Sequence, residues 1–243
     1  MTAEADDRRR AELVTALGAV RARIAAACEA SGRDPRGVSL IAVTKTYPAT
    51  DVATLAALGV LDIGENRDQE ARAKIAELAE PPGPPAALRW HLIGRLQTNK
   101  ARSVASYAEA VHSVDRPKLV RALAGAAAEV RPEPLDVFVQ VSLDGDPERG
   151  GVIPGGVDEL ADEVAAQPAL RLRGLMAVPP LAADADAAYA RLAELAVAVR
   201  ERHPEADALS AGMSGDLEAA IRHGSTHVRV GTALLGRRAP VFG

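Results

Sequence analysis

Residues 38–64 read VSLIAVTKTYPATDVATLAALGVLDIG, and this stretch decides the fold. The run VSLIAVT (38–44) is short, apolar and rich in β-branched residues, which is typical of a buried strand. ATDVATLAALG (49–59) has apolar residues three and four positions apart, which predicts a helix, and VLDIG (60–64) predicts a second strand. A strand, a helix and a strand in this order predict two parallel strands joined by a right-handed crossover.

The same alternation continues along the rest of the chain. Helical spacing recurs in residues 65–80 and 184–203. Eight strands are predicted, at residues 38–44, 60–64, 89–94, 110–114, 135–143, 170–178, 207–212 and 226–234. Eight such units in a chain of 243 residues favour a (β/α)8 TIM barrel over an open doubly wound sheet. A doubly wound sheet typically has a Gly-rich turn after its first strand, and this sequence has no such turn there.

The last unit of this barrel is incomplete. Nine residues follow the eighth predicted strand, which is too few for a full eighth helix. We therefore expect an amphipathic helix over about residues 8–30 to cover the gap. The Pro/Gly-rich residues 81–85 are interpreted as a surface loop, because periodic segments of the same type lie on both sides. We predict a single domain over residues 1–243.

Composition narrows the classes of partner and compartment. The formal net charge is −4, with Lys+Arg 29 against Asp+Glu 33, and no long basic stripe occurs. Nucleic acid and anionic membranes are therefore not expected as partners. The start MTAEADDRRR lacks the apolar run of a secretory signal, and no apolar segment reaches membrane-spanning length. We expect a cytoplasmic protein.

No metal site is predicted. Cys28 is the only cysteine, so neither an internal disulfide nor a cysteine-based metal site can form. It continues the apolar helical spacing that begins at Leu13, and we interpret it as a small buried hydrophobe rather than a reactive thiol. Asp144, Asp146 and Glu148 follow the fifth strand without a nearby histidine, which favours a solvated loop.

Chemistry in a TIM barrel gathers where strands run into the following loops. Lys45 follows the first strand with no turn residue between, at the predicted barrel mouth. A lysine there is either a solvated rim charge or, when neutral, a nucleophile toward aldehydes. Asn66 follows the second strand, where a helix cap and a ligand contact remain alternatives, and Glu65 suits the start of a helix.

The third, seventh and eighth strands also end in polar or small residues. Residues 91–100 form a dense polar cluster that indicates a pocket wall, although His91 itself is interpreted as a hydrogen-bonded core residue. Residues 210–216 (SAGMSGD) precede a predicted helix, and residues 229–233 (RVGTA) end the eighth strand. The loops after strands seven and eight form the habitual phosphate site of this barrel, so we predict phosphate binding there.

An amine at the first strand and a phosphate site at the last two suggest pyridoxal 5′-phosphate (PLP) held as a Schiff base. On this pattern the chain resembles the pyridoxal-phosphate homeostasis (PLP-binding) protein family, single-domain relatives of the alanine racemase barrel. The resemblance covers nearly the whole chain, through the segments IAVTKTYP (41–48), IGENRDQE (63–70), WHLIGRLQTNK (90–100), VHSVD (111–115), LMAVPP (175–180), SAGMSGDLEAAI (210–221) and RVGTALLGRR (229–238).

The resemblance implies a role for each matching residue. Lys45 is expected to form the Schiff base, Asn66 to lie beside the cofactor ring, and Arg229 to face the pyridine nitrogen. The phosphate is expected to be held by Ser214, Gly231 and Thr232, with Met213 and Ser210 nearby.

Three positions depart from the family pattern. Ala211 and Gly215 stand where the family has other residues around the Ser-Met-Gly-Met-Ser turn, which affects the packing near the phosphate. Arg149 stands where the family often has a lysine after strand five. Because arginine does not act as a Schiff-base amine near neutral pH, a role for a second lysine is not expected here.

The resemblance implies a cofactor carrier rather than a strong catalyst. Arginine at the ring nitrogen keeps that nitrogen unprotonated and weakens the electron sink that aminotransferases use. Alanine racemase also needs a tyrosine from an added domain across a dimer interface, and we expect no such domain here. Tyr47, two residues from Lys45, is expected on the lysine's side.

We therefore predict a PLP carrier or buffer that delivers cofactor to apo-enzymes, as a monomer. A weak amino-acid racemase is the alternative. A Schiff-base aldolase acting on sugar phosphates is a third class, since it also joins a barrel lysine to a phosphate site.

Overall fold

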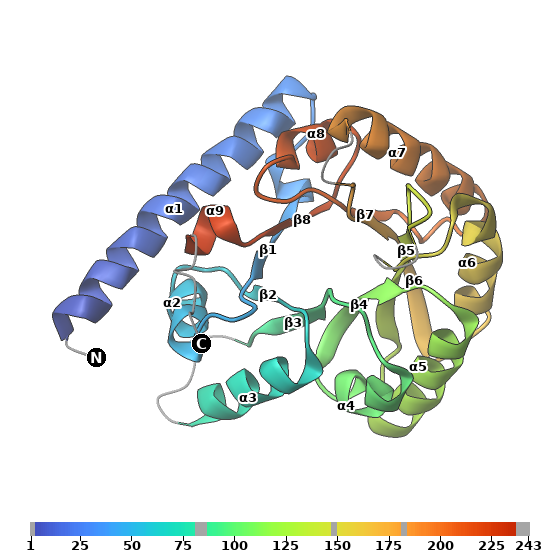
Figure 1. The fold of residues 1–243 in the computed structure, drawn as a ribbon, viewed down its shortest axis with the longest axis horizontal. Helices are drawn as coiled ribbons and strands as arrows, with labels where there is room; N and C mark the ends of the chain where they lie inside the picture. Colours follow the sequence, from blue (N-terminus) through green and yellow to red (C-terminus); the bar gives the residue numbers. More distant parts are fainter. Residues whose placement is uncertain (1–2, 81–86, 147–149, 181–183, 237–243) are drawn as a thin grey trace.

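The computed structural model is a closed barrel of parallel strands (Figure 1). It describes residues 3–80, 87–146, 150–180 and 184–236. Within these ranges the strands are β1 (Ser39–Val43), β2 (Asp62–Glu65), β3 (Arg89–Leu92), β4 (Ala108–Val114), β5 (Leu135–Val141), β6 (Leu170–Ala177), β7 (Ala208–Ser210) and β8 (His227–Val230). The TIM-barrel prediction is confirmed, and each strand begins within two residues of its predicted start.

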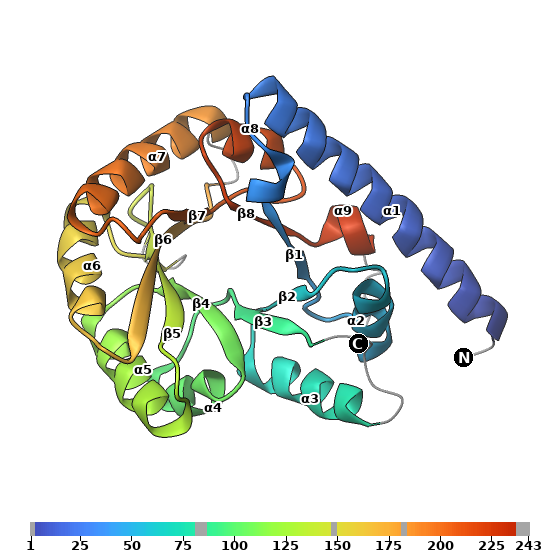
Figure 2. The ribbon, with the colours of Figure 1, turned by 180° about the vertical axis from the view of Figure 1, so that it is seen from behind.

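Helices surround the barrel in both views (Figures 1 and 2). In the described part of the chain they are α1 (Ala3–Ala30), α2 (Ala49–Ala57), α3 (Asp68–Ala79), α4 (Ala101–Ala105), α5 (Pro117–Val130), α6 (Val157–Ala165), α7 (Ala185–Arg202), α8 (Leu217–Arg222) and α9 (Thr232–Leu235). Short 3-10 turns lie at η1 (Pro35–Gly37), η2 (Thr98–Lys100) and η3 (Pro154–Gly156). None of the described helices is both long and apolar enough to cross a bilayer.

The barrel closes between its first and last strands. Ala42 of β1 is paired with Val230 of β8, and on its other side β1 is paired with β2 through Val43 and Gly64. The eighth strand was predicted to continue to residue 234, which is wrong. The chain becomes helical at Thr232, because the backbone carbonyl of Gly231 accepts hydrogen bonds from the next turn and ends the strand pairing.

Helix α1 takes the place of the missing eighth helix, as predicted. It lies along α8 and α9 on the outside of the barrel (Figure 1) and begins at Ala3, earlier than expected. Its apolar stripe is buried, from Leu13 at 0% exposed to Cys28 at 0%, so the interpretation of Cys28 as a buried hydrophobe is confirmed. The stripe packs with β1, β2 and β8 in one core cluster.

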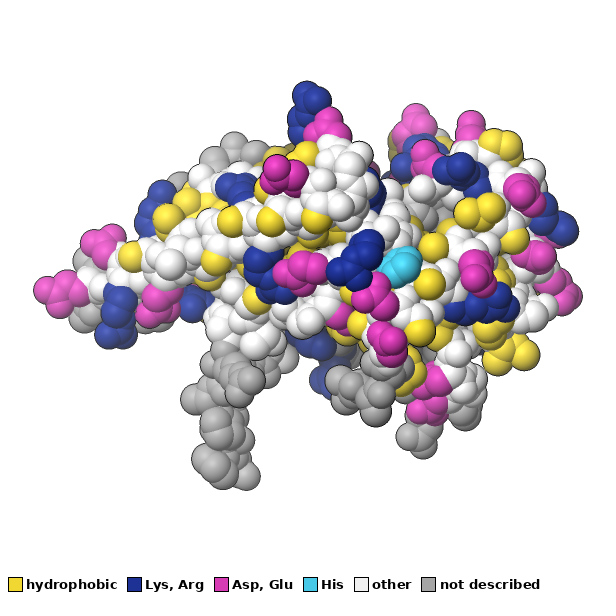
Figure 3. Space-filling view, turned by 90° about the horizontal axis from the view of Figure 1, so that it is seen from above, with side chains coloured by type: hydrophobic (Ala, Val, Ile, Leu, Met, Phe, Trp, Pro, Cys, Tyr) yellow, Lys and Arg dark blue, Asp and Glu magenta, His cyan; other side chains and the backbone are white. Residues whose placement is uncertain are grey.

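Charged side chains fasten α1 to its neighbours. Arg23 forms an ion pair with Glu218 of α8 at 2.6 Å, and Arg9 forms one with Asp51 of α2 at 2.7 Å. Arg33, just after α1, donates a hydrogen bond to the carbonyl of Ile221 at 2.7 Å. Basic and acidic side chains are interleaved on the face that includes α1 and α8 (Figure 3). These contacts fix α1 against α2 through Arg9 and against α8 through Arg23, and Arg33 holds the segment after α1 to α8.

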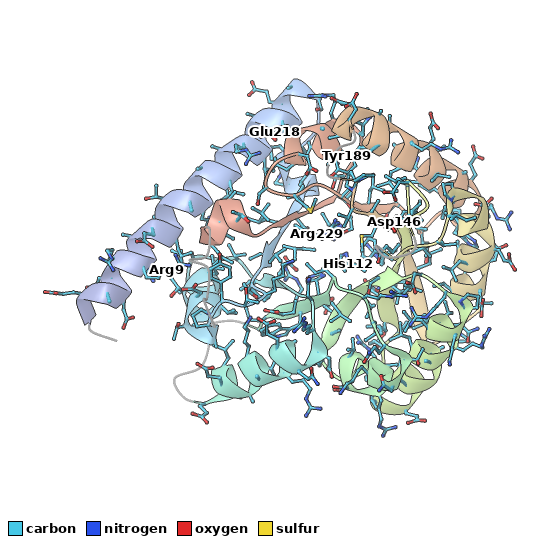
Figure 4. All side chains as sticks on the ribbon, viewed as in Figure 1. Arg9, His112, Asp146, Tyr189, Glu218 and Arg229 are labelled. Carbon is cyan, nitrogen blue, oxygen red and sulfur yellow. The ribbon has the colours of Figure 1, made fainter. Side chains whose placement is uncertain are left out.

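The barrel interior is apolar at one level and polar at another. Ala110, Phe138, Met176 and Ala208 form a small buried cluster inside the strands. The His112 ring stacks on Phe138 with ring centroids 4.3 Å apart, and it lies in the middle of the barrel (Figure 4). The interior is therefore filled by side chains, and a ligand site has to lie at the strand ends.

Candidate functional site

Seven of the eight residues predicted to bind the cofactor line one pocket of about 350 Å³. They are Lys45, Asn66, Met213, Ser214, Arg229, Gly231 and Thr232. Val43, Ile93, Val178 and Gly215 complete the lining. The structure thus brings together residues that are up to 187 positions apart in the sequence, at the carboxyl ends of the strands.

Strand register explains why these residues meet. Ala42 is level with Val230, so the residues that follow β1 and β8 leave the barrel at the same edge, which places Lys45 near Gly231 and Thr232. Gly64 of β2 is level with Val43, which brings Asn66 to that edge as well. Parallel strands are therefore sufficient to collect these groups.

Lys45 lies at the mouth of this pocket and is exposed. It also lines an adjoining pocket of about 650 Å³ with Tyr47 and Gly236. The next residue, Thr46, has φ 72°, a left-handed conformation that costs a β-branched residue about 1–3 kcal/mol. Its N–H donates to the carboxylate of Glu70, which holds the bend. The bend follows β1 and turns the chain directly after Lys45.

A buried ion pair lies beneath this bend. The Glu65 carboxylate is 1% exposed and accepts hydrogen bonds from Lys74 Nζ and the Thr44 hydroxyl, each at 2.6 Å. Lys74 Nζ also donates to the Thr44 carbonyl at 2.7 Å. Burial raises the pKa of Glu65, against the opposing effect of Lys74. Glu65 is therefore an internal anchor of the Lys45 segment rather than a pocket residue.

The alternative of Asn66 as a helix cap is wrong. Helix α3 has Arg67 at its N-cap position, without a side-chain capping hydrogen bond. Asn66 lines the pocket, and Gly94 lies against its backbone so closely that a Cβ at residue 94 would come within 2.4 Å of the Asn66 carbonyl oxygen. A glycine at this position is thus what allows Asn66 to approach the end of β3.

Arg229 brings a buried positive charge to the pocket (Figure 4). It is 4% exposed, and it donates to the Ser210 hydroxyl and the Ala177 carbonyl, each at 2.8 Å. No ion pair joins it to a carboxylate within the described residues. Burial lowers its pKa to about 10, so the guanidinium stays protonated at neutral pH.

Ser210 does not line the pocket. It is 0% exposed, and its hydroxyl lies between Arg229 and His112 Nδ1, the latter at 2.8 Å. His112 Nε2 is 3.0 Å from His91 Nδ1, and His91 Nε2 is 3.0 Å from the Asp62 carboxylate. The prediction that His91 is a hydrogen-bonded core residue is confirmed, but it belongs to a chain of five side chains rather than standing alone.

Asp62, at the acidic end of this series of side chains, determines which atom donates and which accepts in each hydrogen bond. Burial raises the pKa of Asp62, but hydrogen bonds from His91 and Arg89 outweigh it and bring that pKa down to about 2. Asp62 therefore only accepts, so His91 donates to it from Nε2 and, when neutral, accepts at Nδ1 from His112. His112 then accepts from Ser210, whose oxygen accepts from Arg229. Burial lowers the pKa of His112 well below its usual value, which keeps that ring neutral.

The two small-residue turns after β7 and β8 lie side by side. The backbone N–H of Ala233 donates to Ser214 Oγ at 3.1 Å, which joins the turns directly. Arg23 of α1 donates to the Ser214 carbonyl at 2.9 Å from behind. One concave surface is thus bordered by the hydroxyl groups of Ser214 and Thr232 and by Gly215 and Gly231. This lining suits an anion such as phosphate.

The departures from the family pattern fall in different places. Ala211 is 0% exposed and packs in the core, away from the pocket lining. Gly215 lines the pocket, and a Cβ there would meet no atom within 4 Å. Arg149 and Glu148 lie outside the described residues, as does the predicted loop 81–85. Among the described residues no group of three or more His, Cys, Asp or Glu side chains could hold a metal ion.

Sequence reasoning missed the apolar walls and the supporting layer of the pocket. Ile93 and Val178 follow β3 and β6 and line the pocket, but apolar residues at strand ends carry no local signal of a site. His112 was not singled out, although it lies within the quoted segment VHSVD (111–115). Its role depends on Ser210, 98 residues away, which only the folded barrel brings close.

Comparison with known proteins agrees with the barrel fold. Residues 16–239 match the family model of the alanine racemase N-terminal domain. The pyridoxal phosphate homeostasis protein of Mycobacterium tuberculosis (strain ATCC 25618 / H37Rv) is 51% identical over 243 residues, covering 95% of this chain and 94% of that protein. PipY of Synechococcus elongatus PCC7942, solved with PLP bound, is 35% identical with a TM-score of 0.76, covering 88% of this chain and 100% of that one.

The fold likeness extends to larger enzymes. Alanine racemase from Corynebacterium glutamicum superimposes with a TM-score of 0.67 at 17% identity, covering 93% of this chain and 63% of the racemase. That likeness concerns the barrel alone. With its barrel, its strand-end pocket and its extensive identity to these relatives, the chain belongs to the alanine racemase N-terminal domain family and, within it, to the pyridoxal phosphate homeostasis proteins.

Proposed function

We propose that this protein binds PLP as a Schiff base on Lys45 and acts as a carrier or buffer in PLP homeostasis, without robust catalysis. The observation that carries this proposal is the single pocket lined by an amine, a buried guanidinium, an amide and two hydroxyl-bearing turns. The names of the relatives and the PLP bound to PipY support the same ligand.

The residues present fit this cofactor. A pocket of about 350 Å³ is within the range of small-molecule sites. Lys45 supplies the amine, Ser214, Gly231 and Thr232 would hold the phosphate, and Asn66 would lie beside the ring. When bound, PLP supplies an aldehyde that condenses with an amine and a conjugated ring that can accept electrons. Ser210 acts indirectly, by fixing the guanidinium of Arg229.

Two features favour a carrier over a racemase. Arg229 keeps its proton at neutral pH, so it does not protonate a ring nitrogen placed against it. None of the three tyrosines lines the pocket. The Tyr47 hydroxyl donates to the Gly236 carbonyl at 2.6 Å, and Tyr189 is 0% exposed. A tyrosine base for racemisation is thus missing from the described lining of this pocket.

A spectroscopic titration tests the proposal. PLP added to the purified protein should give a visible absorbance band, and borohydride reduction should fix a pyridoxyl adduct on the peptide that contains Lys45. Lys45→Ala should lose both signals. The matched control Lys118→Ala, an exposed lysine on α5, should keep them. A wild-type protein that stays without the band, or an adduct on another lysine, contradicts the proposal.

Transfer and turnover separate the carrier from the racemase. The PLP-loaded protein, mixed with an apo PLP-dependent enzyme, should restore the activity of that enzyme, while the Lys45→Ala protein treated in the same way should not. A chiral assay with alanine or serine should detect no turnover at ordinary enzyme rates. Rapid racemisation would contradict the carrier function and support the racemase alternative.

A further inference from the structure

A second pocket, of about 530 Å³, lies beside the candidate cofactor site. One wall follows β2, another follows β3, and the third precedes α5. Its polar lining consists of Asn66, Arg67, Arg95, Gln97, Lys100 and Arg116, together with the carboxylate of Asp68. Asn66 also lines the candidate cofactor site, so the two pockets share one wall. We call this second space the cationic pocket.

Positive charge dominates the lining. Four cationic side chains line the pocket, against the single carboxylate of Asp68. That carboxylate belongs to an 8% exposed residue and accepts a hydrogen bond from the Ser103 hydroxyl at 2.7 Å. The chain as a whole carries a net charge of −4. A concave surface of the opposite sign therefore concentrates the field that attracts anions.

Three of these cations have no ion-pair partner among the described residues. Within the described part of the chain, the side chains of Arg67, Arg95 and Lys100 form neither an ion pair nor a hydrogen bond. Elsewhere arginines are paired with carboxylates, as Arg23 is with Glu218 and Arg89 with Asp62. These three cations line one concave surface, with Arg67 and Arg95 exposed to solvent, so an anion that enters can pair with them without breaking an existing ion pair.

The fourth cation is held in position. The Arg116 guanidinium pairs with Asp115 through Nη1 and donates to the Leu96 carbonyl through Nη2 at 2.9 Å. This leaves a fixed arginine at the wall and three adjustable cations around it. Because Asp115 offsets the charge of Arg116, the attraction for an anion comes mainly from Arg67, Arg95 and Lys100, and an arginine can bind two phosphate oxygen atoms at once.

We propose that the cationic pocket is a second binding site, for a small dianion of the phosphate monoester class. Its concave shape and volume suit a small molecule rather than an extended polymer. The site is distinct from the Ser214 and Thr232 turns, which lie in the neighbouring pocket. It does not depend on PLP binding, because its cations come from different segments of the chain.

Calorimetric titration of inorganic phosphate into the full chain, at low ionic strength, tests this site. The double variant Arg95→Gln/Lys100→Gln should weaken phosphate binding by about tenfold or more, because two charge-assisted contacts are lost. Arg67→Gln should also weaken it. The matched control Arg200→Gln, an exposed arginine on α7, should leave the affinity unchanged. Added salt should weaken binding to the wild type.

The candidate cofactor site is the competing location for phosphate, and Thr232→Ala identifies it. Phosphate binding that survives in Thr232→Ala and is lost in the double variant supports the cationic pocket. The proposal is overturned if the double variant and Arg67→Gln bind as the wild type does, if only Thr232→Ala loses binding, or if the wild type binds no phosphate. Equal melting temperatures of wild type and variants exclude unfolding as the cause. Since no PLP is used, failure here leaves the carrier function untouched.

Discussion

At the scale of single residues, Arg229 is where burial and charge conflict most directly. Its guanidinium has moved out of water without a carboxylate partner among the described residues, and such a charge is costly unless its N–H groups are satisfied. Two of them are satisfied by Ser210 and the Ala177 carbonyl. Ser210 in turn depends on His112, so the position of the charge depends on a neutral histidine in the barrel interior.

Replacing His112 by phenylalanine tests this dependence. His112→Phe keeps a ring against Phe138 but removes one hydrogen bond from Ser210, which retains Arg229, and one from His91, which retains Asp62. The loss of these two buried hydrogen bonds should lower the free energy of unfolding by about 1–3 kcal/mol. It should also weaken PLP binding, because Arg229 is less well fixed. Urea denaturation and a PLP titration measure the two effects. His223→Phe serves as control, because it removes only one contact with the half-exposed Asp186. An equal loss in both variants would contradict the role of the buried hydrogen-bonded side chains.

Lys74 offers a second test at this scale. Lys74→Met removes the only cation paired with buried Glu65 in the described residues, so it should cost about 3–5 kcal/mol in the free energy of unfolding. The double variant Lys74→Met/Glu65→Gln should recover part of the loss, because the buried side chain at position 65 is then neutral and only the partly exposed Glu70 loses its ion pair with Lys74. Chemical denaturation gives these values. Arg191→Met, which breaks a surface pair with Glu194, should cost no more than about 1 kcal/mol.

At the scale of elements, α1 links the outside of the barrel to the pocket. Its apolar stripe covers β1, β2 and β8, and its charged face reaches α8. Arg23 is the direct link, because it binds both Glu218 and the carbonyl of Ser214. The helix that fills the gap in the barrel therefore also supports the turn proposed to hold the phosphate.

Arg23→Met should weaken PLP binding although Arg23 does not line the pocket. Losing one hydrogen bond behind Ser214 corresponds to about 0.5–1.5 kcal/mol, or about 2- to 10-fold in the dissociation constant. Fluorescence or absorbance titration with PLP measures the change. Arg21→Met, on the same helix but bonded to the Leu58 carbonyl, should bind PLP as the wild type does. Equal PLP affinity of the two variants would contradict a contribution of α1 to the PLP site.

At the scale of the whole molecule, closure of the barrel makes the elements mutually dependent. Pairing of β1 with β8 joins the two ends of the described chain, and α1 packs across the same junction. We propose that residues 1–243 form one domain. Heating should then give a single transition with coincident signals from far-UV and near-UV circular dichroism.

PLP should move that transition upward. Ligand that binds only the folded state adds about 2.7 kcal/mol at a concentration one hundred times its dissociation constant. Lys45→Ala should show a smaller upward shift than the wild type. Two separate transitions, or a PLP shift confined to one of them, would divide the chain into independent units.

The barrel interior should also make stability depend on pH. Burial lowers the pKa of His227 to about 4, and burial also lowers the pKa of His112 well below its usual value. The unfolded chain takes up protons below about pH 6.5 that the folded chain does not, so the free energy of unfolding should fall as pH drops. Between pH 6.5 and 5, His227 alone should account for a loss of about 1.5 kcal/mol. Urea denaturation across this range measures the slope, which should be shallower in His227→Gln; a stability that rises toward pH 5 would contradict it.

The sequence by itself determined the order of the elements and the chemical types at the strand ends. Strand and helix periods are local properties, so the eight strands and the apolar stripe from Leu13 to Cys28 could be predicted from spacing alone. The position of Lys45 after β1 and of the small residues after β7 and β8 followed from the same rhythm. Element boundaries were less well predicted: α1 begins earlier than expected, and the largest error among the strands is the end of β8, because an apolar run does not reveal where a helix begins.

The tertiary structure alone decided which of these groups meet. Ser210 was expected near the phosphate, but strand register turned it into the barrel to bind His112, which is 98 residues away. Glu65 and Asn66 are neighbours in sequence, yet one is buried against Lys74 and the other lines two pockets. The cations of the cationic pocket likewise come from separate connections, Arg67 after β2 and both Arg95 and Lys100 after β3. Contacts of this kind depend on barrel closure and on side-chain direction, which local sequence patterns do not contain.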